Sequence, residues 1–310
     1  MRAVEVDIRA GIVEELERIA PGRVRTGEPM ARHTSFGLGG PADLFVAPDS
    51  PGAFKDAAAY LADERVPVRL LGRGTNLLVR SGGIEGCVMA VSRAFTRMER
   101  RGGEVVVGSG VDLARLLSFC AEKGLSGLEG LSGIPGSAGG AVVTNAGSFG
   151  VSVGERLREI TVFEPGKPSR RVTAAELDTR YRRIGIPAAS VIEEAVVSVE
   201  PGEPAAVAAR QREVLESKWK TQPVGMRSAG CVFRNPEGLV AGRLIEAAGL
   251  KGARVGGAVV SDVHANYILN DRGATPEDVE DLVELIRKRV FADAGVRLEL
   301  EIEIVGRHGG

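Results

Sequence analysis

The sequence has little cysteine and histidine, with three residues of each. Cys87, Cys120 and Cys231 are too few and too scattered for a disulfide framework, and the histidines do not complete a zinc site, so we expect no structural metal. A formal net charge of -1 gives no reason to expect a polyanionic partner such as nucleic acid. No apolar run reaches the roughly 18 residues that cross a bilayer, and residues 1–7 mix charges where a secretory signal is apolar. We therefore expect a cytoplasmic protein that binds neither nucleic acid nor membrane.

Glycine is abundant instead, with 42 residues, and it is most concentrated between Gly127 and Gly150. Apolar residues such as Leu131 and Ile134 alternate with these glycines and need burial. A buried main chain without side chains can lie close to an anion or a flat ring, and its amide groups then need acceptors. The segment is therefore predicted to bind a large cofactor that carries phosphate.

The chain of 310 residues is long enough for several domains. Apolar periodicity and capping residues predict helices over 12–19, 51–61, 112–123, 205–219, 239–248 and from Pro276, and strands over 43–47, 66–71, 86–91, 104–107, 159–163, 191–199, 267–269 and 297–305. Because the two kinds of element do not alternate regularly, the order predicts an α+β protein. We place domain boundaries to give residues 1–82, 83–202 and 203–310, with a linker at Pro201–Pro204.

A second glycine-containing loop runs from Gly72 to Asn76, after the strand predicted over 66–71. It returns to an apolar strand at Leu77 and does not open a helix, which argues against a Rossmann fingerprint, and no Walker lysine follows. The amides of this loop and the side chains of Thr75 and Asn76 suit a diphosphate, although the same residue types are common in any tight turn.

Within the longer stretch, Gly139-Gly140-Ala141 is predicted to begin a short helix whose first amides are free to face a ligand. The alternative is that these glycines only let a helix pack closely on a sheet. Two phosphate-type loops in adjoining units favour one extended cofactor.

The region between Met226 and Pro236 places Cys231 among small and polar residues. An isolated cysteine is more often an inert core residue than a functional one. The final predicted strand alternates apolar residues with Glu299, Glu301 and Glu303, and periodicity alone does not select one of the three glutamates.

Taken together, these motifs resemble the MurB family of UDP-N-acetylenolpyruvoylglucosamine reductases. The resemblance covers about Arg32 to Gly306. It rests on residues 34–40, 72–76, 133–136 with 145–147, Tyr181-Arg182, 228–236, His264-Ala265-Asn266 and 298–301. It implies an FAD-binding fold of the vanillyl-alcohol-oxidase (PCMH) type, with two subdomains followed by a C-terminal α+β substrate-binding domain.

The implied activity is reduction of UDP-N-acetylglucosamine enolpyruvate to UDP-N-acetylmuramate by NADPH through FAD, in peptidoglycan synthesis. By the same resemblance, Arg182 binds the enolate-like carboxylate, Glu301 acts near that carboxylate as an acid, and Cys231 stands where many members have the serine that protonates the carbon. A thiol is more acidic than a serine hydroxyl, so it can still donate a proton.

The resemblance also assigns residues that hold ligands. The expected FAD-binding residues are Gly72, Arg73, Gly74, Thr75, Asn76, Leu77, Pro135, Gly136, Gly139, Gly140, Asn145 and Gly147. Lys220, Arg234 and Asn235 are expected to contact the substrate, although Lys218 and Lys220 are also what the dipole at the end of a helix favours. Little sequence separates Arg183 from the next strand, which is typical of the shorter family type without a tyrosine-bearing loop.

Two other functions stay open at this point. The chain can be another flavin enzyme of the same fold that oxidises an alcohol or a sugar, although neither glycine loop has a histidine for covalent flavin attachment. It can also be a non-catalytic flavin or nucleotide-sugar binding module. No obligate protein partner is evident in the sequence.

Overall fold

The computed structural model describes residues 10–187 and 189–309. The chain divides into two compact units, and each unit collects separate stretches of sequence. Of the described residues, the first unit contains 10–26, 44–73, 86–187 and 189–217, and the second contains 27–43, 74–85 and 218–309. Both units combine helices with mainly antiparallel strands, which confirms the α+β class. The three-domain division expected from the sequence stays a prediction.

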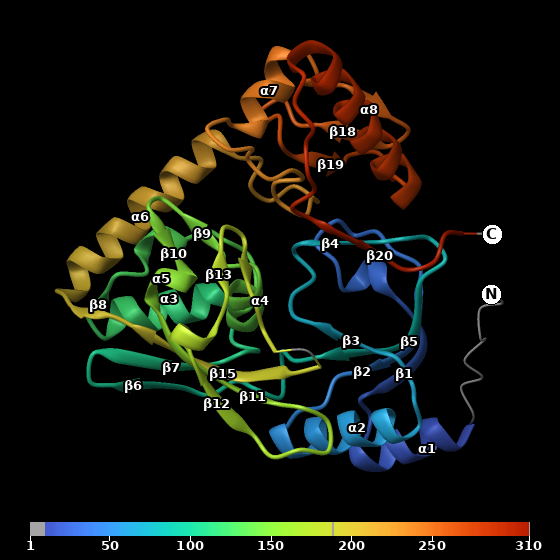
Figure 1. Cartoon of the computed structure of the whole chain (residues 1–310), viewed down its shortest axis with the longest axis vertical. Helices are drawn as coiled ribbons and strands as arrows, with labels where there is room; N and C mark the ends of the chain where they lie inside the picture. Colours follow the sequence, from blue (N-terminus) through green and yellow to red (C-terminus); the bar gives the residue numbers. More distant parts are fainter. Residues whose placement is uncertain (1–9, 188, 310) are drawn as a thin grey trace. The chain divides into compact units, whose positions relative to one another are not determined.

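The first unit begins with a four-stranded sheet. Its strands follow the order β1 (Val24–Pro29), β2 (Pro41–Val46), β5 (Ile84–Ala90) and β3 (Val68–Leu71), and β3 runs parallel to β5. Helices α1 (Ala10–Ile19) and α2 (Pro51–Asp63) lie side by side and pack against it (Figure 1). Ser50 Oγ accepts a hydrogen bond from the amide of Ala53, and Pro51 occupies the first turn, so the predicted helix start is confirmed.

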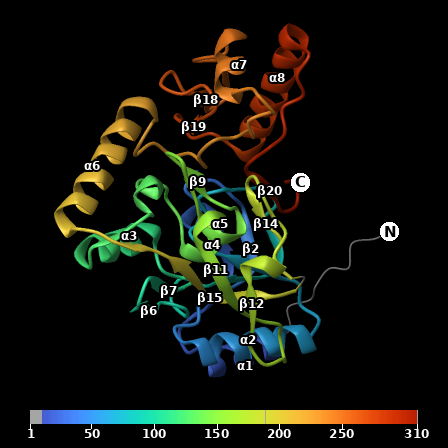
Figure 2. The same ribbon diagram turned by 60° about the vertical axis from the view of Figure 1, so that its left-hand side comes forward.

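A five-stranded antiparallel sheet forms the rest of the first unit. Its order is β12 (Arg170–Thr173), β11 (Leu157–Phe163), β15 (Val191–Ser198), β7 (Glu104–Gly108) and β6 (Met98–Arg101). Helix α4 (Ala138–Val143) packs on β15 and contacts α3 (Leu113–Glu122). Figure 2 shows α4 beside the strands of this sheet. The glycine-rich stretch is thereby fixed to the sheet.

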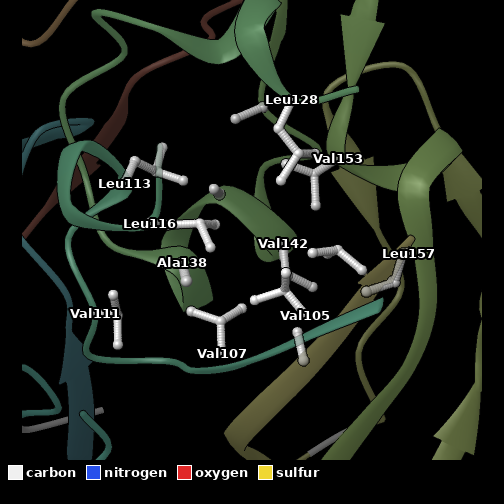
Figure 3. Packing of buried hydrophobic residues seen from close by; sticks show 14 of the residues in the cluster. Val105, Val107, Val111, Leu113, Leu116, Leu128, Ala138, Val142, Val153 and Leu157 are labelled. Atoms are coloured by element: carbon white, nitrogen blue, oxygen red, sulfur yellow. The ribbon is translucent and has the colours of Figure 1, made fainter. Parts of the chain in front are cut away.

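Close packing of small and branched side chains holds α3 and α4 on this sheet. Figure 3 shows Leu113 and Leu116 of α3 and Ala138 and Val142 of α4 against Val107 of β7. The core encloses an apolar cavity of about 20 Å³, which is no larger than the space for one water molecule. This side of the helices therefore serves packing.

Short elements connect these layers. They are β8 (Leu125–Ser126), the 3-10 helix η2 (Glu129–Leu131), β9 (Gly147–Ser148), β10 (Val151–Ser152), α5 (Val153–Arg156), the 3-10 helix η3 (Ala174–Glu176), β13 (Thr179–Arg180), β14 (Arg183–Ile184) and β16 (Glu200–Pro201). The long helix α6 (Pro204–Thr221) follows them and carries the chain toward the second unit.

The second unit is built around a three-stranded sheet of order β17 (Arg254–Val255), β18 (Ala258–Val260) and β19 (Ile268–Asn270). Helices α7 (Ala241–Ala247) and α8 (Pro276–Ala294) pack with it in one apolar core, which also buries Phe36 and Leu78. The 3-10 helix η1 (Met30–Arg32) belongs to this unit, and β4 (Leu77–Val79) pairs in parallel with β20 (Glu303–Val305). Thr275 and Asp278 form a capping box at the start of α8, as the sequence predicts.

One predicted element is wrong in extent. The strand expected over 297–305 is regular only in β20, while Leu300 forms an isolated antiparallel bridge with Phe233. The alternation of residues 298–302 reflects a segment held against one neighbouring loop, which the periodicity alone does not distinguish from a sheet strand.

Across residues 10–187 and 189–309, none of the helices combines the length and the apolar character needed to span a bilayer. In the same residues, His, Cys, Asp and Glu side chains form no group of three or more that could hold a metal ion.

Candidate functional site

The two glycine-containing loops meet in the first unit. A Cβ atom added to Gly72 would lie 2.7 Å from Ser137 Oγ, so only glycine lets the loop after β3 approach the start of α4 this closely. Arg73 Nε lies 3.1 Å from Asp112 Oδ1, and Asp112 in turn forms an isolated bridge with Ser137. The predicted loops therefore lie together as one glycine-lined surface.

The amides at the start of α4 are not free, and that prediction is wrong. Ala138 N donates to Val111 O at 2.8 Å, and Gly139 N donates to Ser109 O at 2.9 Å. Gly140 N donates to Ser137 Oγ at 3.3 Å, which makes Ser137 the N-cap of the helix. Because the helix is anchored by its own chain, its first amides do not point at an open ligand site. Whether Gly139 and Gly140 contact a cofactor in another way stays a prediction.

Two serine hydroxyls of the first unit indicate a bound group. Ser109 Oγ and Ser132 Oγ are buried and have no hydrogen-bond partner in the described part of the chain. Ser109 packs directly against Gly139, where an added Cβ would lie 2.6 Å from Ser109 Cβ. Ser132 immediately precedes the segment with Pro135 and Gly136. Buried hydroxyls are rarely unpaired, so these donors beside the glycine loops fit the phosphates and polar ring edge of a flavin nucleotide.

Arg182 lies at the tip of the β13–β14 hairpin, in the same unit. It has a left-handed conformation with φ 57°, and its Nη1 donates to the carbonyl of Gly147 at 2.9 Å. The side chain of Asn145 donates to the carbonyl of Arg180 at 2.9 Å and accepts from the amide of Gly154 at 2.8 Å. The hairpin is thus fastened to the segment that follows α4.

The later residues of the loop between Gly72 and Asn76, from Gly74 onward, belong to the second unit. Gly74 has φ 61°, and an added Cβ would lie 2.0 Å from His33 O. Asn76 Nδ2 donates to the carbonyl of Glu301 at 3.1 Å, and Glu303 N donates to Asn76 O at 3.0 Å. Thr75 precedes this contact, and Leu77 begins β4 after it. Asn76, expected to bind cofactor, therefore also fixes the segment that carries Glu301.

Cys231 and Glu301 lie on adjoining segments of the second unit, as the resemblance implies for two residues of one site. Glu301 N donates to Val232 O at 2.8 Å, and Arg234 N donates to Glu299 O at 2.9 Å. Cys231 itself bridges Tyr267 on its other side and is partly exposed. Cys231 and Glu301 are therefore placed by main-chain pairing on neighbouring extended segments.

The three residues expected to contact substrate have different environments. Lys220 is exposed in the last turn of α6, and Lys218 in the same turn is buried. Arg234 is 41% exposed, with Nη1 4.0 Å from Glu299 Oε2. Asn235 Oδ1 accepts from the amide of Ala241 at 3.0 Å, at the start of α7. Their contacts with a substrate stay predictions.

Asn266 has a structural role that its motif, His264-Ala265-Asn266, did not predict. Asn266 is only 3% exposed and forms hydrogen bonds with both main-chain polar groups of Phe233. The main-chain N–H of Asn266 donates to His264 Nδ1 at 3.2 Å. An asparagine inside a polar motif is a signal for such a bond, but its partner, 33 positions away along the chain, is visible only in three dimensions.

Family models match two parts of the chain. Residues 42–166 match a model described as an FAD binding domain. Residues 222–305 match the C-terminal domain of UDP-N-acetylenolpyruvoylglucosamine reductase. The order of the two matches is the one that the sequence motifs imply.

Full-length relatives agree with these models. The reductase of Alkalilimnicola ehrlichii is 42% identical over 291 residues, which are 93% of this chain and 97% of the relative. The reductase of Pelobacter propionicus is 40% identical over 286 residues, covering 92% of this chain and 96% of the relative. The crystal structure of the reductase (MurB) from Thermus caldophilus aligns with a TM-score of 0.80 and 35% identity, covering 91% of this chain and 98% of that one.

These matches extend over nearly the whole chain in both directions, and they confirm the resemblance found in the motifs. The chain belongs to the UDP-N-acetylenolpyruvoylglucosamine reductase (MurB) family, with an FAD-binding domain of the PCMH type and the C-terminal domain of that family.

Proposed function

We propose that this protein reduces the enolpyruvyl ether of UDP-N-acetylglucosamine enolpyruvate with NADPH and forms UDP-N-acetylmuramate for peptidoglycan synthesis. The observation that supports this most directly is the adjacency of Cys231 and Glu301 on main-chain-paired segments, within a chain that matches the reductases from end to end. The substrate and NADPH are both soluble nucleotides of the cytoplasm, where we place the reaction, and the proposal requires no protein partner.

The first unit supplies the flavin site in this proposal. The hydroxyls of Ser109 and Ser132 would pair with polar atoms of FAD, and Gly72 and Gly139 let their segments approach Ser137 and Ser109 closely beside that site. Bound there, FAD would supply hydride transfer from NADPH to the terminal vinyl carbon of the substrate. The protein's own task is to hold the carboxylate and to supply one proton.

Arg182 would hold the carboxylate of the substrate. Its guanidinium can offer parallel donors and does not lose its charge at any physiological pH, so it stabilises the negative charge that grows as hydride arrives. Glu301 would act near the same carboxylate, and it must carry a proton, or reach it through a water molecule, to be a donor there.

Cys231 would protonate the carbon next to the carboxylate. The thiol loses its proton to that carbon and leaves a thiolate, which must be reprotonated by solvent before the next turnover. The segment 231–233 is held extended between Tyr267 on one side and Leu300 on the other, which limits the movement of the thiol.

We also propose that the protein is of the shorter family type. The β13–β14 hairpin turns through only Tyr181 and Arg182, and β15 already begins at Val191. These limits leave little chain for an additional loop that closes over a substrate.

The experiment is an assay of NADPH oxidation with the purified flavoprotein. We expect the flavin to give an absorbance band at about 450 nm. We also expect NADPH to be consumed only when UDP-N-acetylglucosamine enolpyruvate is present. An oxidase of the same fold would instead form hydrogen peroxide from an alcohol or a sugar, and a binding module would hold flavin without turnover. Either result would contradict the proposal.

A further inference from the structure

Both polar ends of the Asn145 side chain have partners within the first unit. Its Nδ2 donates to the carbonyl of Arg180 at 2.9 Å, and its Oδ1 accepts from the amide of Gly154 at 2.8 Å. Asn145 is 8% exposed, and its main chain has φ 42°. Asparagine is the non-glycine residue that most readily adopts this left-handed conformation, so the position suits its side chain and its backbone together.

The partner of Asn145 is the base of the hairpin that presents Arg182. Thr179 pairs with Ile184 and Arg180 with Arg183, so Tyr181 and Arg182 alone form the turn. Arg182 has φ 57° there, a conformation that an arginine seldom adopts without support from its surroundings. The carbonyl held by Asn145 lies only two residues before Arg182.

A second contact ties the same two segments together. Arg182 Nη1 donates to the carbonyl of Gly147, two residues after Asn145. The hairpin therefore contacts the segment 145–147 at its base, through Asn145, and at its tip, through the guanidinium. Two anchor points fix both the distance and the direction of the arginine, whereas one would leave a short exposed hairpin free to rotate.

We propose that Asn145 is the positioning residue for Arg182: it holds the β13–β14 hairpin so that the guanidinium stays aimed for the substrate carboxylate. This inference rests on the proposed function, because it assigns Arg182 to that carboxylate. The expectation that Asn145 also contacts the cofactor stays a prediction, because its amide retains a second N–H and a second lone pair.

The test uses Asn145→Asp in the holoenzyme. This variant keeps the shape and the acceptor for Gly154, but it puts a carboxylate oxygen against the carbonyl of Arg180 where a donor stood. We expect the reoxidation of the reduced flavin by the enolpyruvyl substrate to slow by about 10- to 100-fold, because misplacement of a charge-stabilising group has costs of this size. Flavin reduction by NADPH should change by less than about 2-fold, because Arg182 does not act in that half-reaction.

A double-mutant comparison separates positioning from general damage. If Asn145 acts through Arg182, Asn145→Asp should have almost no further effect on reoxidation in an Arg182→Ala background. The matched control is Asp178→Asn, an equally small change at the residue just before β13. Asp178 forms an ion pair with Arg180, and both side chains are exposed. This control should leave both half-reactions unchanged.

A binding measurement provides a readout without turnover. The dissociation constant of UDP-N-acetylmuramate, measured by calorimetry, should rise in Asn145→Asp and should not rise further when Arg182→Ala is already present. Should Asn145→Asp fail to accumulate as folded protein, Asn145→Gly retains the left-handed backbone and should give the same pattern.

Several results would overturn the inference. These are an equal slowing of reoxidation in both backgrounds, an equal slowing of both half-reactions, loss of flavin from Asn145→Asp, and unchanged kinetics in that variant. If the wild-type flavoprotein itself is not reoxidised by the enolpyruvyl substrate, then the proposed function fails, and that outcome is seen before any variant is compared.

Discussion

The side chain of Asn266 forms with the main chain of Phe233 the pair of hydrogen bonds that a residue of a neighbouring strand would form. Phe233 N donates to Asn266 Oδ1 at 2.9 Å, and Asn266 Nδ2 donates back to Phe233 O at 2.8 Å, with both residues buried. Val232 N also donates to the main-chain carbonyl of Asn266 at 2.8 Å. One asparagine thus holds the segment that carries Cys231 in its extended conformation.

Replacing Asn266 with aspartate should therefore destabilise the second unit. The variant keeps the acceptor for Phe233 N but loses the donor to Phe233 O, and it buries a charge beside a carbonyl oxygen. We expect a loss of about 2 to 4 kcal/mol in the free energy of unfolding, measured by urea titration. Glu299→Gln changes an exposed side chain of the neighbouring segment and should stay within about 0.5 kcal/mol of wild type. Equal midpoints for Asn266→Asp and wild type would show that the reciprocal bonds carry no stability.

The cysteines differ in accessibility, which predicts selective labelling. Cys87 and Cys120 are buried at 0% and 1% exposure, and burial raises the pKa of each thiol to about 12. Cys231 is partly exposed. A disulfide reagent should therefore label one thiol in the native protein and all three in urea. In Cys231→Ser the native protein should not be labelled, and rapid native labelling of that variant would contradict the assignment.

Cys231 as the proton donor predicts a contrast between two substitutions. Cys231→Ser keeps a hydroxyl donor and should retain turnover within about 10-fold of wild type, whereas Cys231→Ala should slow flavin reoxidation by about 100-fold or more. Stopped-flow measurement of the two half-reactions resolves this, since flavin reduction by NADPH should be nearly unaffected in both variants. If Cys231→Ala slowed the two half-reactions equally, the thiol would not be the acid.

Glu301 should be important for catalysis and unimportant for folding. Its bonds to Val232 and Asn76 use main-chain atoms, which remain in Glu301→Ala. We expect this variant to melt close to wild type while flavin reoxidation slows by about 100-fold, the usual size of an acid–base contribution. Calorimetry and stopped-flow on the same preparation check both statements. Normal reoxidation in a correctly folded variant would remove Glu301 from the site.

His264 should make stability depend on pH near neutrality. Burial lowers the pKa of its imidazole and outweighs a main-chain hydrogen bond that raises it, while Lys251 lowers and Glu246 raises this pKa by smaller amounts. As the pH falls below about 6.5, the unfolded chain takes up a proton before the folded chain does, so stability present above this pH is lost on acidification. Urea unfolding at about pH 7.5 and about pH 5.5 measures the loss.

The comparison for His264 is the variant His264→Asn, which keeps an acceptor near the amide of Asn266 but does not titrate. It should lose less stability than wild type between the two pH values, because the other histidines and the carboxyl groups contribute equally to both proteins. An identical loss in the two proteins would assign the pH dependence to other groups.

Local signals in the sequence predicted local structure well. Ser50 before Pro51, and Thr275 with Asp278, mark helix starts that the structure reproduces, because a capping bond joins residues only three positions apart. The adjacency of Cys231 and Glu301 was expected from family resemblance, and periodicity alone could not have selected Glu301 from its neighbours.

Contacts between distant residues were the part that the sequence could not show. The amide of Gly139 was predicted to be free because its acceptor, the carbonyl of Ser109, comes from a preceding loop. The bond from the Asn145 side chain to the carbonyl of Arg180 likewise could not be predicted from the sequence. In both cases the polar group is satisfied by tertiary structure, which sequence spacing does not encode.

The most direct test of the account is anaerobic reoxidation of the photoreduced flavoprotein by UDP-N-acetylglucosamine enolpyruvate. The reaction is monitored by absorbance at about 450 nm. The account predicts that the oxidised flavin spectrum returns and that one UDP-N-acetylmuramate forms for each flavin. A flavin that stays reduced in the presence of this substrate, or one that is reoxidised without forming the lactyl ether product, would contradict it.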